Sequence, residues 1–249
     1  MKLDAFALSI SGRRHSNEDA VCARPELGLF MVADGLGGYE GGEIASTIAV
    51  ETIQDLVRRT ASDADVTWPY SIDRTRSLEE NEVIVATKVA NDRIVARRSG
   101  VLDQMGSTVA LLRFARAGRV VIAHVGDSRV YRLRDGAIQQ LTADHSLVNQ
   151  MIAAGMTPDE TFPWRHVITR ALGLASAEPD VQSETAITDD LYLLCSDGLY
   201  EGLEPAEMAT LLDPITHGVS IEHCCRELVT AAYEGGSRDN ISAVVVRAC

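Results

Sequence analysis

The chain has 249 residues, of which 46% are hydrophobic, and its formal net charge at pH 7 is -13. A chain of this length can bury one substantial core, and we expect a single domain over residues 1–249. The acidic excess argues against nucleic acid as a partner, because binding there depends on Lys and Arg side chains that neutralise phosphates.

The cysteine content and the N-terminal residues indicate the cellular compartment. The five cysteines are an odd number and form no Cys-x-x-Cys pair. They therefore argue against a disulfide framework or a thiolate zinc site and fit a reducing cytosol. The first residues lack the apolar core of a signal peptide, and no apolar run approaches the ~20 residues of a membrane helix. We expect a cytoplasmic protein with no membrane segment.

Hydrophobic spacing predicts the elements in chain order. Phe6, Leu8 and Ile10 alternate with smaller residues and predict an opening strand. Further strands are expected over 29–33, 109–114, 120–125, 130–134, 137–141, 191–195 and 241–246, with a tight hairpin at Asp135-Gly136. Helices are expected over about 43–58, 79–98, 146–154, 205–212 and 220–233, and residues 60–78 should form a surface loop.

The order of these elements indicates the fold class. The helices come in pairs and the strands in antiparallel meanders, which favours an α+β fold over a regular βαβ alternation. A Gly-rich turn covers residues 35–42, but no Lys follows Gly35-Leu36-Gly37-Gly38. A nucleotide-binding P-loop is therefore not expected.

Four aspartates stand beside apolar, strand-like runs, and each is followed directly by Gly, Ser or Asn: Asp34, Asp127, Asp197 and Asp239. A carboxylate beside a buried strand is costly to desolvate unless it is paired or binds a metal. Ordinary turn chemistry would explain any one of these sites. Four of them together favour strands that deliver oxygen ligands to one cleft.

Oxygen ligands of this kind favour Mg²⁺ or Mn²⁺, and the six scattered histidines form no His-Glu-x-x-His zinc motif. Two such ions can lower the pKa of a shared water and direct it at phosphorus. The phosphoryl oxygens then need a cation, and Arg13 or Arg14 precedes the acidic pair Glu18-Asp19. A guanidinium group suits phosphate geometry. We expect Arg13 to bind the phosphate and Arg14 to contribute little.

Eight short motifs follow one another between residues 9 and 246: Arg13-x-x-x-Asn17-Glu18-Asp19, Val32-Ala33-Asp34-Gly35-Leu36-Gly37-Gly38, Met105-Gly106-Ser107-Thr108, Val125-Gly126-Asp127-Ser128-Arg129, Leu141-Thr142-x-Asp144-His145-Ser146, Thr169-Arg170-Ala171-Leu172-Gly173, Ser196-Asp197-Gly198-Leu199 and Ser237-Arg238-Asp239-Asn240-Ile241-Ser242. Single motifs of this length are weak evidence. In this order they resemble the PPM family of metal-dependent serine/threonine protein phosphatases (type 2C), in its compact bacterial form.

The resemblance implies a four-layer αββα sandwich, in which helix pairs flank two antiparallel sheets and a flap covers about residues 144–172. It implies that Asp34 bridges two metal ions and that the Gly35 carbonyl binds one of them. Asp197 and Asp239 would complete the other metal's ligands.

The resemblance also implies the roles of the remaining site residues. Glu18 and Asp19 would act through metal-bound water, and Arg13 would bind the substrate phosphate. Asp127 matches a position that helps Asp197 to hold a third, weaker metal, although pairing with Arg129 would also explain this carboxylate.

The chain departs from the family where a general acid is expected. Leu36 occupies the position of a His in eukaryotic members, and Tyr39 stands where many bacterial members have His. Metal-bound water would then protonate the leaving alkoxide. His145 is an alternative that we expect to be structural, and His124 is expected to be a core histidine.

The implied function is hydrolysis of phosphoserine and phosphothreonine in proteins, opposing a bacterial serine/threonine protein kinase. One alternative is a pseudophosphatase that binds phosphoprotein without turnover, but no metal-bridging Asp is lost. Another is a phosphatase of a single phosphoserine anti-sigma-antagonist protein. Such proteins usually lack the flap, which this sequence has.

Overall fold

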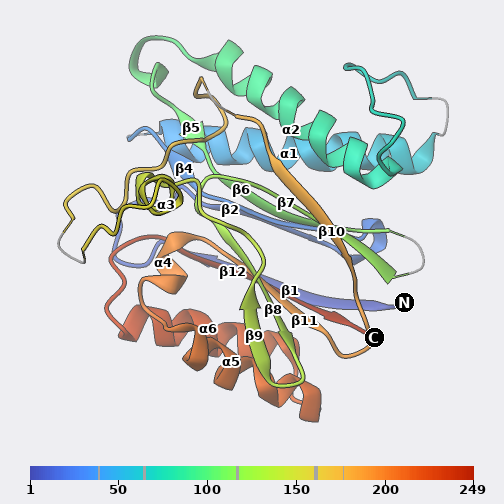
Figure 1. Ribbon diagram of the computed structural model, residues 1–249, viewed down its shortest axis with the longest axis vertical. Helices are drawn as coiled ribbons and strands as arrows, with labels where there is room; N and C mark the ends of the chain where they lie inside the picture. The colour runs from blue at the N-terminus through green and yellow to red at the C-terminus, as the bar shows by residue number, and fades with distance from the viewer. Residues whose placement is uncertain (39, 64–65, 116–117, 160–161, 176) are drawn as a thin grey trace.

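Two antiparallel sheets pack face to face, and helices cover both outer faces (Figure 1). The computed structural model describes residues 1–38, 40–63, 66–115, 118–159, 162–175 and 177–249. The first sheet contains, in spatial order, β1 (Leu3–Ile10), β12 (Ile241–Ala248), β11 (Leu191–Cys195), β8 (Arg129–Arg134) and β9 (Ala137–Gln140). The second contains β10 (Asp180–Thr185), β7 (Arg119–Val125), β6 (Val109–Phe114), β3 (Leu29–Ala33) and β2 (Ala20–Arg24).

The helices form the two outer layers. The second sheet is covered by α1 (Gly41–Ser62) and α2 (Leu78–Arg97), and the first by α5 (Pro205–Leu212) and α6 (Ile221–Glu234). Two shorter helices, α3 (Leu147–Ala153) and α4 (Asp197–Tyr200), lie near one end of the sandwich, together with the two-stranded pair β4 (Gly35–Leu36) and β5 (Gly106–Ser107) (Figure 1). The predicted αββα sandwich is confirmed.

Three hydrophobic clusters hold the four layers together. One lies between α1, α2 and the second sheet, one between α5, α6 and the first sheet, and one between the two sheets. In β3, Leu29 and Met31 face the helices while Phe30 and Val32 face the other sheet. All five residues of β3 are buried, which explains why the strand is a continuous apolar run rather than an alternating one.

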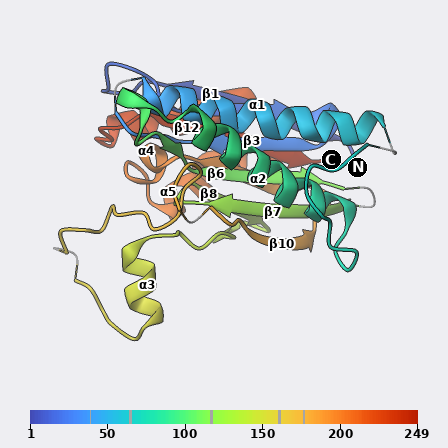
Figure 2. The same cartoon turned by 90° about the horizontal axis from the view of Figure 1, so that it is seen from above.

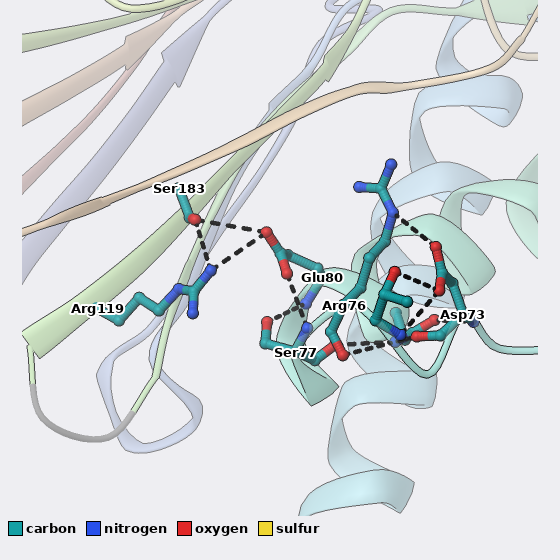
Figure 3. A network of polar contacts seen from close by, with 8 residues as sticks. Asp73, Arg76, Ser77, Glu80, Arg119 and Ser183 are labelled. Carbon is teal, nitrogen blue, oxygen red and sulfur yellow. Dashed lines mark hydrogen bonds and ion pairs between the residues drawn. The ribbon is translucent and has the colours of Figure 1, made fainter.

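The start of α2 is anchored on the second sheet through Glu80 (Figure 3). The Ser77 hydroxyl accepts a hydrogen bond from the Glu80 backbone N–H, and the Glu80 carboxylate accepts one from the Ser77 N–H, which completes a capping box. The same carboxylate lies 3.4 Å from both the Arg119 guanidinium on β7 and the Ser183 hydroxyl on β10. Glu80 thus joins a helix cap to two strands.

Most predicted elements are present, with shifted ends. The expected hairpin is confirmed by Asp135 and Gly136, whose φ angles are 51° and 75°. The helix expected over 43–58 is longer, Gly41–Ser62, and Ser220 caps α6 as expected by accepting from the His223 N–H. The strands β2 and β10 and the short helix α4 were not predicted.

The loops of functional interest gather at one end of the molecule. Both termini lie at the opposite end, where the backbones of Lys2 and Cys249 are hydrogen-bonded (Figure 1). The segment around α3 projects away from the sandwich (Figure 2). Within the described residues, none of the helices combines the length and the apolar character needed to span a bilayer.

Candidate functional site

Asp34 lies between β3 and β4, and its backbone is held on both sides. Its N–H donates to the Thr108 hydroxyl at 3.0 Å, and its carbonyl accepts from the Thr108 N–H at 2.8 Å and from the Ser107 hydroxyl at 3.1 Å. Burial raises the pKa of the Asp34 carboxyl well above its ordinary value, and repulsion from the other site aspartates adds to the shift. The sandwich therefore delivers this carboxylate into an acidic cluster.

Two glycines allow the loop that carries Glu18 to approach the start of α1. A Cβ on Gly42 would lie 1.9 Å from Glu18 Oε2, and one on Gly35 would lie 2.6 Å from the Glu18 carbonyl. The Ser46 hydroxyl donates to that carbonyl at 2.6 Å. The glycines thus provide the space that Glu18 occupies beside Asp34.

Asn240 holds the same loop from the other side. Its side-chain oxygen accepts from the Glu18 N–H at 2.8 Å, and its side-chain nitrogen donates to the carbonyls of Ser11 and Ser16 at 3.0 and 2.8 Å. Asn240 follows Asp239 directly, so one tight contact places Glu18 next to the turn before β12.

Asp19 is only half satisfied by hydrogen bonds. Its Oδ2 accepts from the hydroxyls of Ser196 and Ser242 at 2.8 and 2.6 Å. Its Oδ1 is buried and has no partner among the described residues. Burial raises the pKa of Asp19 to about 6, against the lowering effect of the two serines.

Asp197 begins α4 directly after Ser196, and like Asp19 it has one unpartnered oxygen. Its Oδ1 is also buried without a partner in the described part of the chain. Burial raises the pKa of Asp197 well above its ordinary value, with further contributions from Asp127 and Asp239. An unpaired buried carboxylate oxygen costs free energy, and a cation bound at this position would offset that cost.

The two candidate arginines lie in different surroundings. The Arg14 guanidinium donates to Asp239 Oδ2 at 2.5 Å. This hydrogen bond and the opposite charge of Asp239 raise the pKa of Arg14. Arg13 instead donates to the Tyr233 carbonyl at 3.2 Å, with its guanidinium 5.2 Å from the centre of the Tyr233 ring. This geometry favours Arg14, which was expected to contribute little, as the cation of the acidic cluster. The choice of Arg13 stays a prediction without support from the contacts.

Asp127 is not paired with Arg129 in the way that the sequence left open. Arg129 forms a bidentate ion pair with Asp144, with its Nη2 2.7 Å from Oδ2, and stacks on the Tyr200 ring at 3.5 Å from the centroid. Burial raises the pKa of Asp127 to about 6, and repulsion from Asp144 adds to this. A third-metal role for Asp127 stays a prediction.

A tighter group of potential ligands lies outside the acidic cluster. Among the described residues, His124, His145 and Asp180 bring their donor atoms within 4.8 Å of one another. His124 and His145 are both buried, as expected for structural histidines. For the position of the general acid, Leu36 lies in β4 opposite Gly106, and Tyr39 lies outside the described residues.

Sequence reasoning missed several residues that shape the cluster. Ser196 and Ser242 donate to Asp19, and Asn240 positions Glu18. All three lie inside the motifs that carry the resemblance, next to or near a candidate metal ligand. Their position in those motifs was the available signal, but their partners come from distant segments.

Comparisons with known proteins agree with this architecture. A family model described as protein phosphatase 2C matches residues 11–231. The chain is 34% identical to the serine/threonine protein phosphatase PstP of Mycobacterium tuberculosis, over 93% of this chain and 42% of PstP, and 31% identical to the serine/threonine phosphatase stp of Listeria innocua, over 94% and 90%. A crystal structure of the PstP catalytic domain with two manganese ions superimposes with a TM-score of 0.80 at 31% identity, covering 98% of this chain and 97% of that one.

The chain therefore belongs to the protein phosphatase 2C family. These relatives confirm the family that the motifs resemble, and they are themselves serine/threonine phosphatases. The chain spans about two fifths of the length of PstP, 42%, so it corresponds to part of that relative.

Proposed function

We propose that the chain hydrolyses phosphoserine and phosphothreonine in proteins, using divalent metal ions held by the acidic cluster. Two ions would bind per site, as Mn²⁺ or Mg²⁺. The proposed ligands are Asp34, the Gly35 carbonyl, Asp197 and Asp239, with Glu18 and Asp19 supporting them and Asp127 available for a third ion.

The observation that carries this proposal is the pair of buried, unpartnered oxygens, Asp19 Oδ1 and Asp197 Oδ1. They lie in a cluster where burial and mutual repulsion raise the pKa values of Asp19, Asp34 and Asp197. Cations would remove both costs at once, and carboxylate and carbonyl oxygens are the ligands that Mg²⁺ and Mn²⁺ prefer. The manganese in the PstP catalytic domain supports the choice of metal.

When bound, such ions supply a water of lowered pKa and neutralise charge on the phosphoryl oxygens. The chain's own contribution is positioning. The Ser196 and Ser242 hydroxyls fix the orientation of Asp19, and Thr108 fixes the backbone of Asp34. The substrate phosphate would be held by an arginine at the cluster, and the contact with Asp239 favours Arg14 for this task.

The substrates would be phosphorylated proteins, with a serine/threonine protein kinase acting in the opposite direction. The net charge of -13 supports a role without nucleic acid. All five cysteines are free thiols, which supports a reducing, cytoplasmic location. We also propose that residues 1–249 act as one catalytic domain whose flap covers about residues 144–172.

Phosphopeptide hydrolysis tests the proposal. The chelator-treated protein should be inactive, and added Mn²⁺ or Mg²⁺ should restore turnover of phosphoserine and phosphothreonine peptides. A phosphotyrosine peptide of the same sequence serves as the matched control substrate. Full activity after exhaustive chelation, or no activity with either metal, would refute the metal-dependent reading.

A further inference from the structure

His145 stands where the flap leaves the sandwich, and it is bonded twice to Gly126. Its backbone N–H donates to the Gly126 carbonyl at 2.9 Å, and its ring Nδ1 accepts from the Gly126 N–H at 3.1 Å. Gly126 directly precedes Asp127. One residue, through its backbone and its ring, thus closes a ring of two hydrogen bonds on the turn that carries a candidate metal ligand.

The other side of the same ring faces Asp180 at the start of β10, which in turn binds Arg170 in the returning end of the flap. Ring Nε2 lies 3.2 Å from Asp180 Oδ2, and Asp180 Oδ1 accepts from Arg170 Nη1 at 2.6 Å. The His145 carbonyl accepts from the Thr169 N–H at 2.7 Å. His145 therefore joins three segments: the β7–β8 turn, the entry to the flap and the return from it.

The hydrogen bonds argue against a metal ion between His124, His145 and Asp180. Because Nδ1 of His145 accepts from a backbone N–H, the single proton of the neutral ring is on Nε2, where a metal would have to bind. The Arg170 guanidinium lies 3.2 Å from that same Nε2 and already supplies a positive charge. The His124 ring is stacked on the His145 ring, with 4.4 Å between their centroids. His124 Nε2 is hydrogen-bonded to the Ala143 carbonyl oxygen at 2.8 Å.

The charge state of the ring agrees with this arrangement. Burial and the neighbouring His124 lower the pKa of His145, so the neutral ring that Nδ1 acceptance requires is favoured near pH 7. Burial also lowers the pKa of His124. The stacked pair is thus two neutral rings that pack together.

Gly126 needs an external restraint. Its φ angle is +103°, a region that favours glycine, and a Cβ there would lie 2.6 Å from Thr108 Cγ2. A glycine carries no side chain that could fix the turn, so its backbone partners contribute to the direction of Asp127, together with the Tyr200 hydroxyl beside the Asp127 carboxylate and the contact of Ser128 with Thr108. Both polar groups of that backbone are bonded to His145.

We propose that His145 is a positioning residue that couples the flap to the catalytic cluster, by holding the Gly126 backbone and so the direction of Asp127. The effect on turnover rests on the proposed function, whereas the effect on the Gly126 amide does not. Movement of Arg170 in the flap, transmitted through Asp180 on β10, would reach Asp127 by this route.

Two substitutions separate the contact of the His145 ring with Gly126 from its contact with Asp180. In His145→Asn, the amide oxygen falls near the place of Nδ1 and can accept from Gly126, whereas contact with Asp180 is lost. In His145→Gln, the amide nitrogen falls near the place of Nε2 and can reach Asp180, whereas the acceptor for Gly126 is lost. The exposed His223, whose side chain lies on the outer face of α6, gives the matched control His223→Gln.

The first readout is hydrogen exchange of the Gly126 amide by nuclear magnetic resonance, in protein free of metal and substrate. His145→Gln should speed this exchange about tenfold, the effect of one net hydrogen bond, while His145→Asn and His223→Gln keep the wild-type rate. Equal exchange rates in all four proteins would overturn the proposal. This holds even if the wild-type protein hydrolyses no phosphopeptide, a result that would refute only the proposed function.

The second readout is coupling in turnover. His145→Gln should lower kcat about tenfold or more in the wild-type background, because small misplacement at a catalytic site is costly. In an Asp127→Ala background the same substitution should change kcat less than about twofold, because the two act through one element. If His145→Gln lowers kcat by the same factor in the wild-type and Asp127→Ala backgrounds, His145 does not act through Asp127. That result would contradict the proposed coupling.

Discussion

Asp19 shows at the residue scale how the candidate site treats its carboxylates. One oxygen accepts from two serine hydroxyls, and the other is buried without a partner in the described part of the chain. If Asp19 only stabilised a turn, both of its oxygens would be expected to accept hydrogen bonds, since an unpaired buried oxygen costs about 1–3 kcal/mol. The arrangement is instead what a cation-binding site requires.

Asp34→Ala should abolish turnover, because this carboxylate lies in the centre of the repulsive cluster and is proposed to hold both ions. We expect a loss of kcat of at least about a thousandfold, in the range of other groups that stabilise charge directly. The measurement is phosphopeptide turnover with saturating Mn²⁺, on variants whose circular dichroism matches wild type. Activity within tenfold of wild type would remove Asp34 from the proposed role.

Arg14→Ala and Arg13→Ala decide which arginine binds phosphate. The contact of Arg14 with Asp239 favours Arg14 as the phosphate-binding residue. Arg14→Ala should then raise KM about tenfold or more and lower kcat less, because a residue that binds phosphate contacts substrate and transition state alike. Arg13→Ala should then be close to neutral, since Arg13 lies against Tyr233. The reverse pattern would restore the choice made from the sequence.

Residue types and motif order were enough to find the acidic residues, but not to choose between neighbours. Arg13 and Arg14 are identical in type and adjacent, so only the direction of each side chain separates them. Asp127 and Arg129 likewise suggested a local pair, whereas Arg129 binds Asp144 across a turn. Partners that come from distant segments are not encoded in local spacing.

At the element scale, prediction depended on how many faces each strand buries. The strands β3, β7 and β11 are covered on both faces, and their apolar runs were recognised. The edge strand β10 alternates exposed and half-buried residues and is mostly polar, so its hydrophobic pattern is too weak to read. The edge strand β2 is short, and α4 has only four residues.

A buried ion pair ties the outer helices to the second sheet. Arg113 on β6 donates to Glu82 on α2 at 2.8 Å, Thr60 on α1 donates to the same carboxylate at 2.6 Å, and the Glu82 side chain is 1% exposed. Glu82→Ala leaves the largely buried Arg113 guanidinium without its carboxylate partner, with only the carbonyls of Leu27 and Phe114 as acceptors. We expect the free energy of unfolding to fall by about 3 kcal/mol, measured by urea denaturation.

The matched control for this prediction is Glu222→Ala, which breaks an exposed pair with Arg226 on α6. Its effect should be below about 0.5 kcal/mol. A similar loss for both substitutions would mean that Glu82 contributes no more than a surface charge. Because the pair lies far from the acidic cluster, kcat of the folded Glu82→Ala protein should be unchanged.

At the scale of the whole molecule, the acidic cluster should make the metal-free protein less stable as pH rises. Burial raises the pKa of Asp19 and of Asp127 to about 6 in the folded chain, above the ordinary value of 3.8. Between these values the folded state binds more protons than the unfolded state, so the free energy of unfolding falls with increasing pH. The stability that the two protonated carboxyls contribute is fully present below about pH 4 and is lost as pH rises through about 6.

Thermal unfolding in the presence of chelator measures this trend. The Tm of the wild-type protein relative to that of Asp19→Asn should fall by several degrees between about pH 4 and about pH 6. The comparison cancels the opposite contribution of the buried His124 and His145, whose lowered pKa values make stability rise with pH in both proteins. Mn²⁺ should raise the wild-type Tm at the higher pH, because ions that bind only the folded state stabilise it. Asp19→Asn should flatten the pH dependence. A metal-free wild-type Tm that does not fall relative to that of Asp19→Asn across this interval would contradict the unfavourable burial of charge inferred for the cluster.

The most direct test of the central claim, that the acidic cluster is a two-metal site, is a calorimetric titration of the chelator-treated protein with Mn²⁺. We predict that two ions bind per chain with high affinity and that Asp34→Asn, which keeps the shape of the side chain and removes its charge, loses this binding. Tight Mn²⁺ binding that Asp34→Asn leaves unchanged, or no tight binding by the wild-type protein, would contradict the account.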